Sequence, residues 1–395
     1  MKITSAEIYH IEPPHNAQGL SLVMLRLWTD AGIYGLGEVA LAYGTGSAAG
    51  AAMVRQLVER YALGADPFRI EQLWHRMFRE TFWALGGGPV VYGGMSAIDV
   101  ALWDIKGKAL GMPVYELLGG LVQSRIRLYA NGWSNLTGED GRPLVCRPEE
   151  YARAVQRVLQ DGYTALKFDP FYINASRRRW HPGPLLDREM TELAVARVAA
   201  VREAVGPEVE ICIEVHGALG VNTAIEVGNR LVESRPFFYE EPVHALNVDA
   251  MRKVARRVPL PIAAGERLYT RFGFREYIEK QVVDIIQPDI SLAGGLTETK
   301  KIADYADTYG IHVQPHLCAG PVHTAACIQL DAAMPNLIIQ EWRPYAGDSM
   351  LELVNEPLDD KARHGYLEVP QRPGLGVTAN EPVLARYPCV HIAVD

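Results

Sequence analysis

Apolar and polar residues alternate along the N-terminal part of the chain in a pattern that predicts three β-strands. The stretch VMLRLWTD alternates most clearly, and AGIYG after it supplies the turn into the next strand. Apolar residues at three- and four-residue steps then predict helices, as Ile98, Leu102 and Ile105 show in the third of them. We expect the strands over residues 2–11, 20–28 and 33–39, and the helices over residues 47–62, 67–80 and 93–110. A sheet followed by helices predicts an α+β domain over residues 1–125.

From residue 126 the pattern changes to short apolar strands that alternate with amphipathic helices. The expected strands cover residues 127–131, 165–169, 210–214, 237–241, 262–266, 283–289, 311–316 and 337–341. Eight alternations over roughly 200 residues predict a parallel (β/α)8-type barrel, here spanning residues 126–342. The Pro-rich segment 343–395 becomes strand-like again at YLEV, and we expect it to pack back on the N-terminal domain. The predicted fold class is α/β, a barrel with an α+β capping domain formed by the N-terminal part and the C-terminal tail.

Composition narrows the class of protein. A chain of 395 residues, 48% of them hydrophobic, can form more than one domain with its own core. The net charge of −8 and the lack of a basic patch argue against a nucleic-acid partner. Five scattered cysteines without a C-x-x-C pair indicate a reducing compartment and no disulfide framework. Neither a signal peptide nor a long apolar stretch is present, so we expect a cytoplasmic protein without a membrane partner.

Six polar side chains stand at or next to the C-terminal ends of the last six predicted strands. They are Glu214, Glu240, Glu266, Asp289, His316 and Glu341. The intervals between them are 26, 26, 23, 27 and 25 residues, each close to one strand, one helix and their loops. A single carboxylate in this position is more often a helix cap or part of a loop salt bridge, but six in phase are not explained that way. The spacing places them on one rim of the barrel, and in this fold that rim carries the active site.

Three of these residues are glutamates on consecutive strands. Their charges would repel one another unless a cation or shared protons offset the repulsion. Hard oxygen ligands that leave coordination positions open suit Mg²⁺, which keeps waters and accepts oxygens of a substrate. The sequence therefore predicts one Mg²⁺ per chain, bound by Glu214, Glu240 and Glu266.

Several longer stretches resemble one known family. AAGERLYTR, VDIIQPDISLAGGLTETKKIA and YEEPV look like the mandelate racemase/muconate lactonising branch of the enolase superfamily, and AIDVALWDIKGKALGMPVYELLGG extends the likeness into the capping domain. The likeness runs along essentially the whole chain. Within the branch it is greatest to acid-sugar dehydratases of the galactonate dehydratase type. In this branch the third-strand ligand is more commonly Asp, whereas here it is Glu214. Members are commonly homo-oligomers, with octamers among them, so the resemblance implies a homo-oligomer.

The resemblance implies roles for the polar residues on strands three to eight. Glu214, Glu240 and Glu266 would hold the metal. His316 would be the base that removes the substrate's C2 proton, kept in one tautomer and made more basic by Asp289. The alternative for His316 is a structural imidazole. Glu341 would bond to the enediolate oxygen as a neutral acid, its pKa raised by burial.

His216 lies two residues after Glu214, so we expect both side chains on one face of the strand. The galactonate dehydratase resemblance makes His216 the general acid that protonates the departing hydroxyl, and the alternative is a loop histidine beside the site. Racemising and lactonising relatives often carry K-x-K on the second strand, whereas this chain has Lys167, Phe168 and Asp169. A lysine-based two-sided racemisation is therefore disfavoured. We expect Lys167 and Asp169 to pair with each other or to contact substrate hydroxyls.

Further candidates concern substrate specificity. Arg267, next to Glu266, is a candidate for substrate binding together with Asp169. Loops near residues 13–20 and 82–92 of the capping domain are expected to contact the substrate, and the glycines of the second suit a lid that excludes water. The insertion over residues 171–183 could cover the site and bring Arg177–Arg179, Trp180 or His181 to a polyol tail. It could equally be an oligomer contact.

These expectations combine into a Mg²⁺-dependent dehydratase that converts a sugar acid, more specifically an aldonate, into a 2-keto-3-deoxy acid. An alternative hypothesis is an enzyme that forms the same enediolate intermediate but catalyses epimerisation or the cycloisomerisation of a sugar lactone. A third reading is a non-catalytic barrel that keeps a metal for folding or for a regulatory interaction. Such a barrel would need neither His316 nor Asp289, and both are present.

Overall fold

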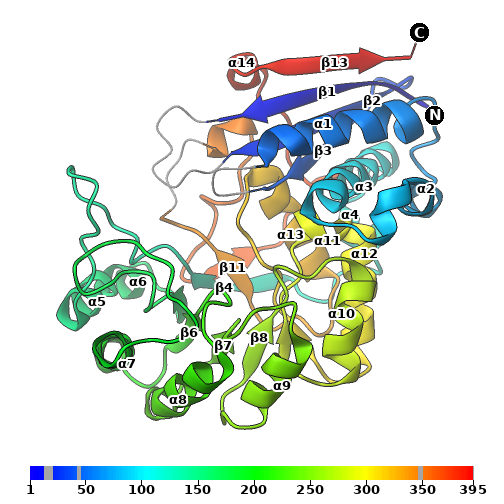
Figure 1. Ribbon diagram of the computed structural model, residues 1–395. Helices are drawn as coiled ribbons and strands as arrows, with labels where there is room; N and C mark the ends of the chain where they lie inside the picture. Colours follow the sequence, from blue (N-terminus) through cyan, green and yellow to red (C-terminus); the bar gives the residue numbers. More distant parts are fainter. Residues whose placement is uncertain (13–20, 42–45, 346–349, 395) are drawn as a thin grey trace.

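The computed structural model describes residues 1–12, 21–41, 46–345 and 350–394. It contains a four-stranded sheet with its helices and an eight-stranded parallel barrel below it (Figure 1). Both chain termini lie at the small sheet (Figure 1). In the described part of the chain no helix is both long enough and apolar enough to cross a membrane.

The small sheet is antiparallel in the order β13-β1-β2-β3. Its strands are β1 (Ile3–Ile11), β2 (Leu22–Thr29), β3 (Tyr34–Val39) and β13 (Cys389–Ala393). In the register, Ile8 lies opposite Leu25 on one side and opposite Val390 on the other. The C-terminal tail therefore completes the N-terminal sheet, which confirms the predicted composition of the capping domain.

The helices of the capping domain follow the predicted order. They are α1 (Ser47–Leu57), which continues as the π-helical turn η1 (Val58–Ala62), then α2 (Ile70–Glu80), the 3₁₀ turn η2 (Phe82–Leu85) and α3 (Pro89–Leu110). Helix α3 begins four residues earlier than expected, because Pro89 fits the first helical turn, where no N–H partner is needed. A Cβ atom on Gly37 of β3 would lie 1.9 Å from the carbonyl oxygen of Ala97. Glycine at this position thus lets α3 lie directly on the sheet.

All eight predicted barrel strands are present and run parallel. They are β4 (Arg125–Ala130), β5 (Ala165–Phe168), β6 (Glu210–Glu214), β7 (Phe238–Glu240), β8 (Ile262–Ala264), β9 (Ile285–Ile286), β10 (His312–Val313) and β11 (Gln340–Trp342). Strand β11 pairs with β4, and a parallel bridge between Val313 and Leu337 closes the ring. The (β/α)8-type barrel is confirmed. The ladder of β9 is shorter than predicted and ends before Pro288, which has no N–H to donate to a neighbour.

Helices surround the barrel between its strands. They are α5 (Pro148–Ala154), α6 (Gln156–Gln160), α7 (Arg188–Val205), α8 (Val221–Leu231) with the 3₁₀ turn η3 (Val232–Ser234), α9 (Val248–Ala255), α10 (Thr270–Glu279), α11 (Ile290–Ala293), α12 (Gly295–Asp307) and α13 (Pro321–Ala332). A short helix, α4 (Val114–Leu117), precedes β4.

The C-terminal segment contacts both domains. It contains the 3₁₀ turn η4 (Leu351–Leu353), β12 (Tyr366–Glu368) and α14 (Glu381–Leu384) before β13. Strand β12 pairs antiparallel with the beginning of β4, whereas β13 joins the capping sheet. The division of the chain at residues 125 and 342 stays a prediction.

Buried hydrogen bonds fix the capping domain to one side of the barrel. The indole Nε1 of Trp74 donates to the carbonyl of Gly294 at 2.8 Å, and the Gly294 N–H donates to Ser96 Oγ at 3.0 Å. Asp99 Oδ2 accepts from the N–H of Thr297 at 3.0 Å. Side chains of α2 and α3 thus hold the start of α12, so the two domains meet near the loops that follow the barrel strands.

Candidate active site

The three glutamates predicted as metal ligands come together at one end of the barrel. Glu214 and Glu240 lie directly opposite each other in the ladder of β6 and β7, and Glu266 follows the end of β8. One carboxylate oxygen from each lies within 4.8 Å of the others. Glu214 and Glu240 are buried, and Glu266 is partly exposed. This cluster of three hard oxygen donors could hold a metal ion, and the donor set fits a divalent cation such as Mg²⁺.

Lys167 of β5 reaches into the same cluster. Its Nζ lies 3.0 Å from both carboxylate oxygens of Glu240, 3.3 Å from Glu214 Oε2 and 3.3 Å from Glu341 Oε1. Burial lowers the pKa of Lys167, but these carboxylates, Glu240 first, raise it well above its usual value. The ammonium is therefore charged. The expected pairing of Lys167 with Asp169 is wrong, because Asp169 lies beside His216 instead.

The neighbouring glutamates share their charge unequally. Burial raises the pKa of Glu240 well above its usual value, and the carboxylate of Glu214 raises it further. Burial acts in the same direction on Glu214, but the charges of His216 and Lys167 outweigh it and lower the pKa of Glu214. The N–H groups of Val215 and His216 also donate to Glu214 Oε1, at 2.9 Å and 2.6 Å. Such a site favours a bound cation, which lets both groups ionise.

His316 and Asp289 form the expected pair. His316 Nδ1 lies 2.7 Å from Asp289 Oδ2, and His316 Nε2 lies 3.1 Å from Glu266 Oε2. Burial lowers the pKa of His316, but Glu266 and the bond to Asp289 raise it well above its usual value. The other oxygen of Asp289 accepts from the N–H and hydroxyl of Ser291, at 2.8 Å and 2.6 Å. The imidazole is therefore held with Nε2 directed at the glutamate cluster.

Glu341 differs from expectation in its ionisation. Burial raises its pKa as predicted, but Lys167 and His316 outweigh burial, and the pKa of Glu341 is lowered. Its Oε1 accepts from Asn131 Nδ2 at 2.6 Å and its Oε2 from the N–H of Leu317 at 2.9 Å. The prediction of a raised pKa is wrong, because it considered burial without the cations. The role of Glu341 as a neutral acid stays a prediction that this environment disfavours.

His216 lies beside the cluster, but not for the reason expected. Strand β6 ends at Glu214, and His216 has a positive φ of 53°, so the alternation of a strand does not set its direction. Its Nδ1 lies 2.8 Å from Asp169 Oδ2. Burial lowers the pKa of His216, but Glu214 and Asp169 raise it above its usual value. The side chain is 48% exposed, so solvent weakens this effect.

Arg267 is tied to the acid cluster. Its Nη1 contacts the carboxylates of both Glu266 and Glu241, and coulombic attraction from Glu266 and Glu241 outweighs burial and raises the pKa of Arg267. Arg267 thus neutralises part of the negative charge beside the site. Its contact with a substrate stays a prediction.

Comparison with known proteins decides the family. Residues 9–119 match the family described as the mandelate racemase/muconate lactonizing enzyme N-terminal domain, and residues 150–383 match the one described as enolase C-terminal domain-like. The chain belongs to the mandelate racemase/muconate lactonizing enzyme branch of the enolase superfamily. The chain is 37% identical to a D-galactonate dehydratase of Ralstonia pickettii (strain 12J), over 97% of this chain and 94% of that protein.

Two further relatives extend this similarity. A D-galactonate dehydratase of Pectobacterium atrosepticum is 36% identical, over 97% of this chain and 94% of that protein. The crystal structure of a member of the enolase superfamily from Salmonella Typhimurium superposes with a TM-score of 0.93 at 38% identity, covering 99% of both chains. The protein described here is therefore an enzyme of the hydro-lyase class.

Three further residues, which the sequence analysis did not use, contact residues of the candidate active site. Asn131 donates to Glu341, Glu241 contacts Arg267, and His323 lies behind Asp289. Asn131 follows the first barrel strand and Glu241 follows Glu240, so the argument from strand ends could have found both. His323 lies in the first turn of α13, where strand spacing gives no signal.

The loops expected to set specificity are only partly described. Residues 13–20 lie outside the described residues. The insertion over 171–183 packs against neighbouring loops, since Arg179 Nη2 donates to Thr137 Oγ1 at 2.7 Å and Arg177 pairs with Glu150. Trp180 Nε1 donates to the carbonyl of Phe171 at 2.9 Å. These contacts tie the insertion to Thr137 in the loop after β4 and to Glu150 in α5, and its role toward a substrate stays a prediction.

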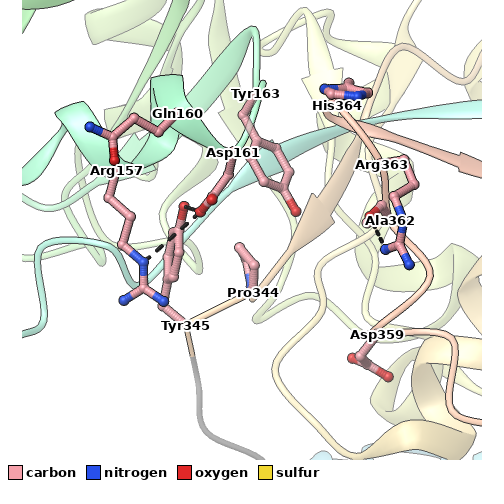
Figure 2. Close-up of a pocket in the computed structure, with 10 residues that line it drawn as sticks. All are labelled: Arg157, Gln160, Asp161, Tyr163, Pro344, Tyr345, Asp359, Ala362, Arg363 and His364. Atoms are coloured by element: carbon pink, nitrogen blue, oxygen red, sulfur yellow. Dashed lines mark hydrogen bonds and ion pairs between the residues drawn. The ribbon is translucent and has the colours of Figure 1, made fainter.

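A separate pocket of about 380 Å³ lies between α6 and the C-terminal segment (Figure 2). The Tyr345 hydroxyl donates to Asp161 Oδ2 at 2.7 Å, and the Arg157 guanidinium lies 4.4 Å from the Tyr345 ring centre. Its lining residues are Arg157, Gln160, Asp161, Tyr163, Pro344, Tyr345, Asp359, Ala362, Arg363 and His364. None of the six polar strand-end residues lines it, so it is distinct from the candidate active site.

Proposed function

We propose that the enzyme dehydrates a sugar acid of the aldonate class to a 2-keto-3-deoxy acid and uses Mg²⁺. The observation that carries the proposal is the placement of two histidine–carboxylate pairs around the glutamate cluster. The pair of His316 and Asp289 follows β10 and β9, and the pair of His216 and Asp169 follows β6 and β5. In an eight-stranded ring, β6 and β10 are on opposite sides. A substrate held between them meets one imidazole on each face.

Glu214, Glu240 and Glu266 would hold the ion. Bound Mg²⁺ would supply positive charge next to the substrate carboxylate, where loss of the C2 proton develops negative charge. Lys167 adds a second positive charge to the site. Its Nζ lies within 3.3 Å of Glu214, Glu240 and Glu341, whose carboxylates keep the ammonium charged.

His316 removes the C2 proton. Asp289 accepts a hydrogen bond from His316 Nδ1, so the proton that the imidazole can release is the one on Nε2. A cation held by Glu266 would offset the carboxylate that raises the pKa of His316, and Nε2 without its proton then has a lone pair directed at the site. This geometry fixes the tautomer that a base needs.

His216 protonates the departing C3 hydroxyl. Asp169 and Glu214 favour its protonated form, so the imidazolium can donate a proton as the C3–O bond breaks. The hydroxyl leaves as water, and the remaining enol loses the proton of its C2 hydroxyl and takes up a proton at C3 to become the 2-keto-3-deoxy acid. The proton taken from C2 and the hydroxyl lost from C3 together account for one water.

The substrate class follows from the relatives, which are named D-galactonate dehydratases. The test is NMR in D₂O with Mg²⁺ and a panel of acid sugars that includes D-galactonate. The proposal predicts a 2-keto-3-deoxy product that carries deuterium at C3, and no product after EDTA treatment. Deuterium at C2 without a keto product would instead indicate epimerisation, and no reaction with any acid sugar would contradict the proposal.

A further inference from the structure

His323 lies on the side of Asp289 that faces away from His316. Its Nε2 is 3.5 Å from Asp289 Oδ1, and the His323 side chain is almost fully buried. Among the described residues neither ring nitrogen of His323 has a hydrogen-bond partner. A buried imidazole without partners is costly, so its position beside a buried carboxylate needs an explanation.

Both domains fix the position of His323. The residue lies in the first turn of α13, where the N–H groups of Gly320 and His323 donate to the two carboxylate oxygens of Glu38, at 2.5 Å and 3.3 Å. Glu38 belongs to β3 of the capping domain and is itself buried. A Cβ atom on Gly320 would lie 3.0 Å from both Glu38 oxygens, so a larger residue would disturb this contact. The capping domain thus holds the helix turn that presents His323 to Asp289.

The protonation states of Asp289 and His323 allow only one favourable position for the ring proton of His323. Burial raises the pKa of Asp289, but the charge and hydrogen bond of His316 and the hydrogen bond from Ser291 lower it, so the carboxylate only accepts hydrogen bonds. Burial lowers the pKa of His323, which is therefore neutral and carries one ring proton. That proton must be on Nε2 for the contact with Asp289 to be favourable. At 3.5 Å the contact is longer than a hydrogen bond, and contacts of this kind often shorten when a substrate binds.

We propose that His323 is a positioning residue that acts through Asp289, so that His316, Asp289 and His323 work as a triad. The role in catalysis rests on the proposed function. Ser291 already donates twice to Asp289 Oδ1, and His323 Nε2 lies 3.5 Å from the same oxygen. When this contact closes to hydrogen-bond distance, His323 becomes a further partner of Oδ1 and opposes rotation of the carboxylate away from the Nδ1–H of His316. Partners of this kind orient the group in front of them, and their loss typically lowers activity by roughly 10- to 100-fold.

The test compares His323→Leu, which has no donor, with His323→Gln, which keeps an N–H near the position of Nε2. Asp331→Asn is the matched control, because Asp331 is a second buried polar residue of α13 and its carboxylate has no hydrogen-bond partner among the described residues. The first measurement is the proton NMR resonance of the His316 Nδ1–H, which does not depend on activity. We expect His323→Leu to shift it and His323→Gln to restore it, with no change in Asp331→Asn. An unchanged resonance in His323→Leu, or an equal shift in the control, would overturn the triad.

The second measurement is the steady-state kinetics of the Mg²⁺-loaded enzyme with D-galactonate. We expect kcat to fall about tenfold or more in His323→Leu with KM unchanged, and to recover in His323→Gln. Full activity in His323→Leu would overturn the triad while leaving the proposed function intact. A wild-type enzyme that dehydrates no acid sugar would contradict the proposed function, and the resonance measurement would still decide whether His323 positions Asp289.

Discussion

Lys167 Nζ lies 3.0 Å from both carboxylate oxygens of Glu240 at the centre of the acid cluster. The protein thus supplies a cation of its own where three glutamates would otherwise repel one another. A metal ion held by Glu214 and Glu240 would share oxygens with this ammonium, so the stability of the cluster and its affinity for a metal are linked.

Replacing Lys167 with Met should destabilise the enzyme after EDTA treatment. Removing one partner of a buried ion pair leaves charge uncompensated and costs roughly 3–5 kcal/mol of unfolding free energy. Because Mg²⁺ then relieves more repulsion, it should raise the Tm of Lys167→Met more than the Tm of the wild type. Thermal unfolding with EDTA and with Mg²⁺ measures both effects.

The matched control is Lys300→Met. Lys300 pairs with Asp304 on the surface, where an ion pair contributes only about 0–1 kcal/mol. Equal losses in the two variants would show that Lys167 does not stabilise the cluster.

Glu240→Gln should weaken the binding of Mg²⁺ to the enzyme. The amide is neutral and has one oxygen to offer, so the cluster loses a hard anionic ligand. We expect calorimetric titration to show that Mg²⁺ binds at least about tenfold more weakly, and activity lost to EDTA should not return at a Mg²⁺ concentration that restores the wild type. Wild-type affinity in this variant would remove Glu240 from the metal site.

Glu38 makes stability depend on pH. Burial raises its pKa from 4.5 to about 7, so the folded protein holds this proton over a pH range in which the unfolded chain has lost it. The folded state therefore loses stability as the pH rises from about 4.5 through 7. Glu38→Gln cannot ionise and should gain about 3 kcal/mol relative to the wild type over that range. Urea unfolding at several pH values gives the difference, and a difference that does not change with pH would contradict the account.

His216→Asn should separate the two halves of the reaction. The variant keeps His316, so deuterium should still exchange at C2, while formation of the keto product should slow by about 10²- to 10⁴-fold without the general acid. Both rates come from NMR spectra of one sample in D₂O. Product formation at the wild-type rate would assign the acid to another residue.

The sequence predicts the acid cluster well because strand ends repeat with a regular period. Glu214, Glu240 and Glu266 lie one unit apart, and parallel strands bring equal positions to the same rim. The barrel and the capping sheet were also predictable from the sequence, because the alternation of apolar and polar residues that defines their strands and helices is a short-range pattern.

Properties that depend on contacts between distant residues could not be predicted in this way. Burial raises the pKa of Glu341, but Lys167, far away in the sequence, and His316 reverse this effect and lower it. The direction of His216 depends on a positive φ after the strand. His323 lies beside Asp289 in a helix turn whose N–H groups bond Glu38 of the other domain.

The central claim is that the imidazole of His316, beside a metal held by the glutamates, removes the proton at C2. The most direct test is the rate of C2 deuterium exchange in wild-type enzyme and in His316→Asn, with Mg²⁺ and an acid sugar that the wild type accepts. The account predicts that exchange and product both disappear in the variant while its Mg²⁺ affinity stays at the wild-type level. Exchange at the wild-type rate in His316→Asn would contradict it.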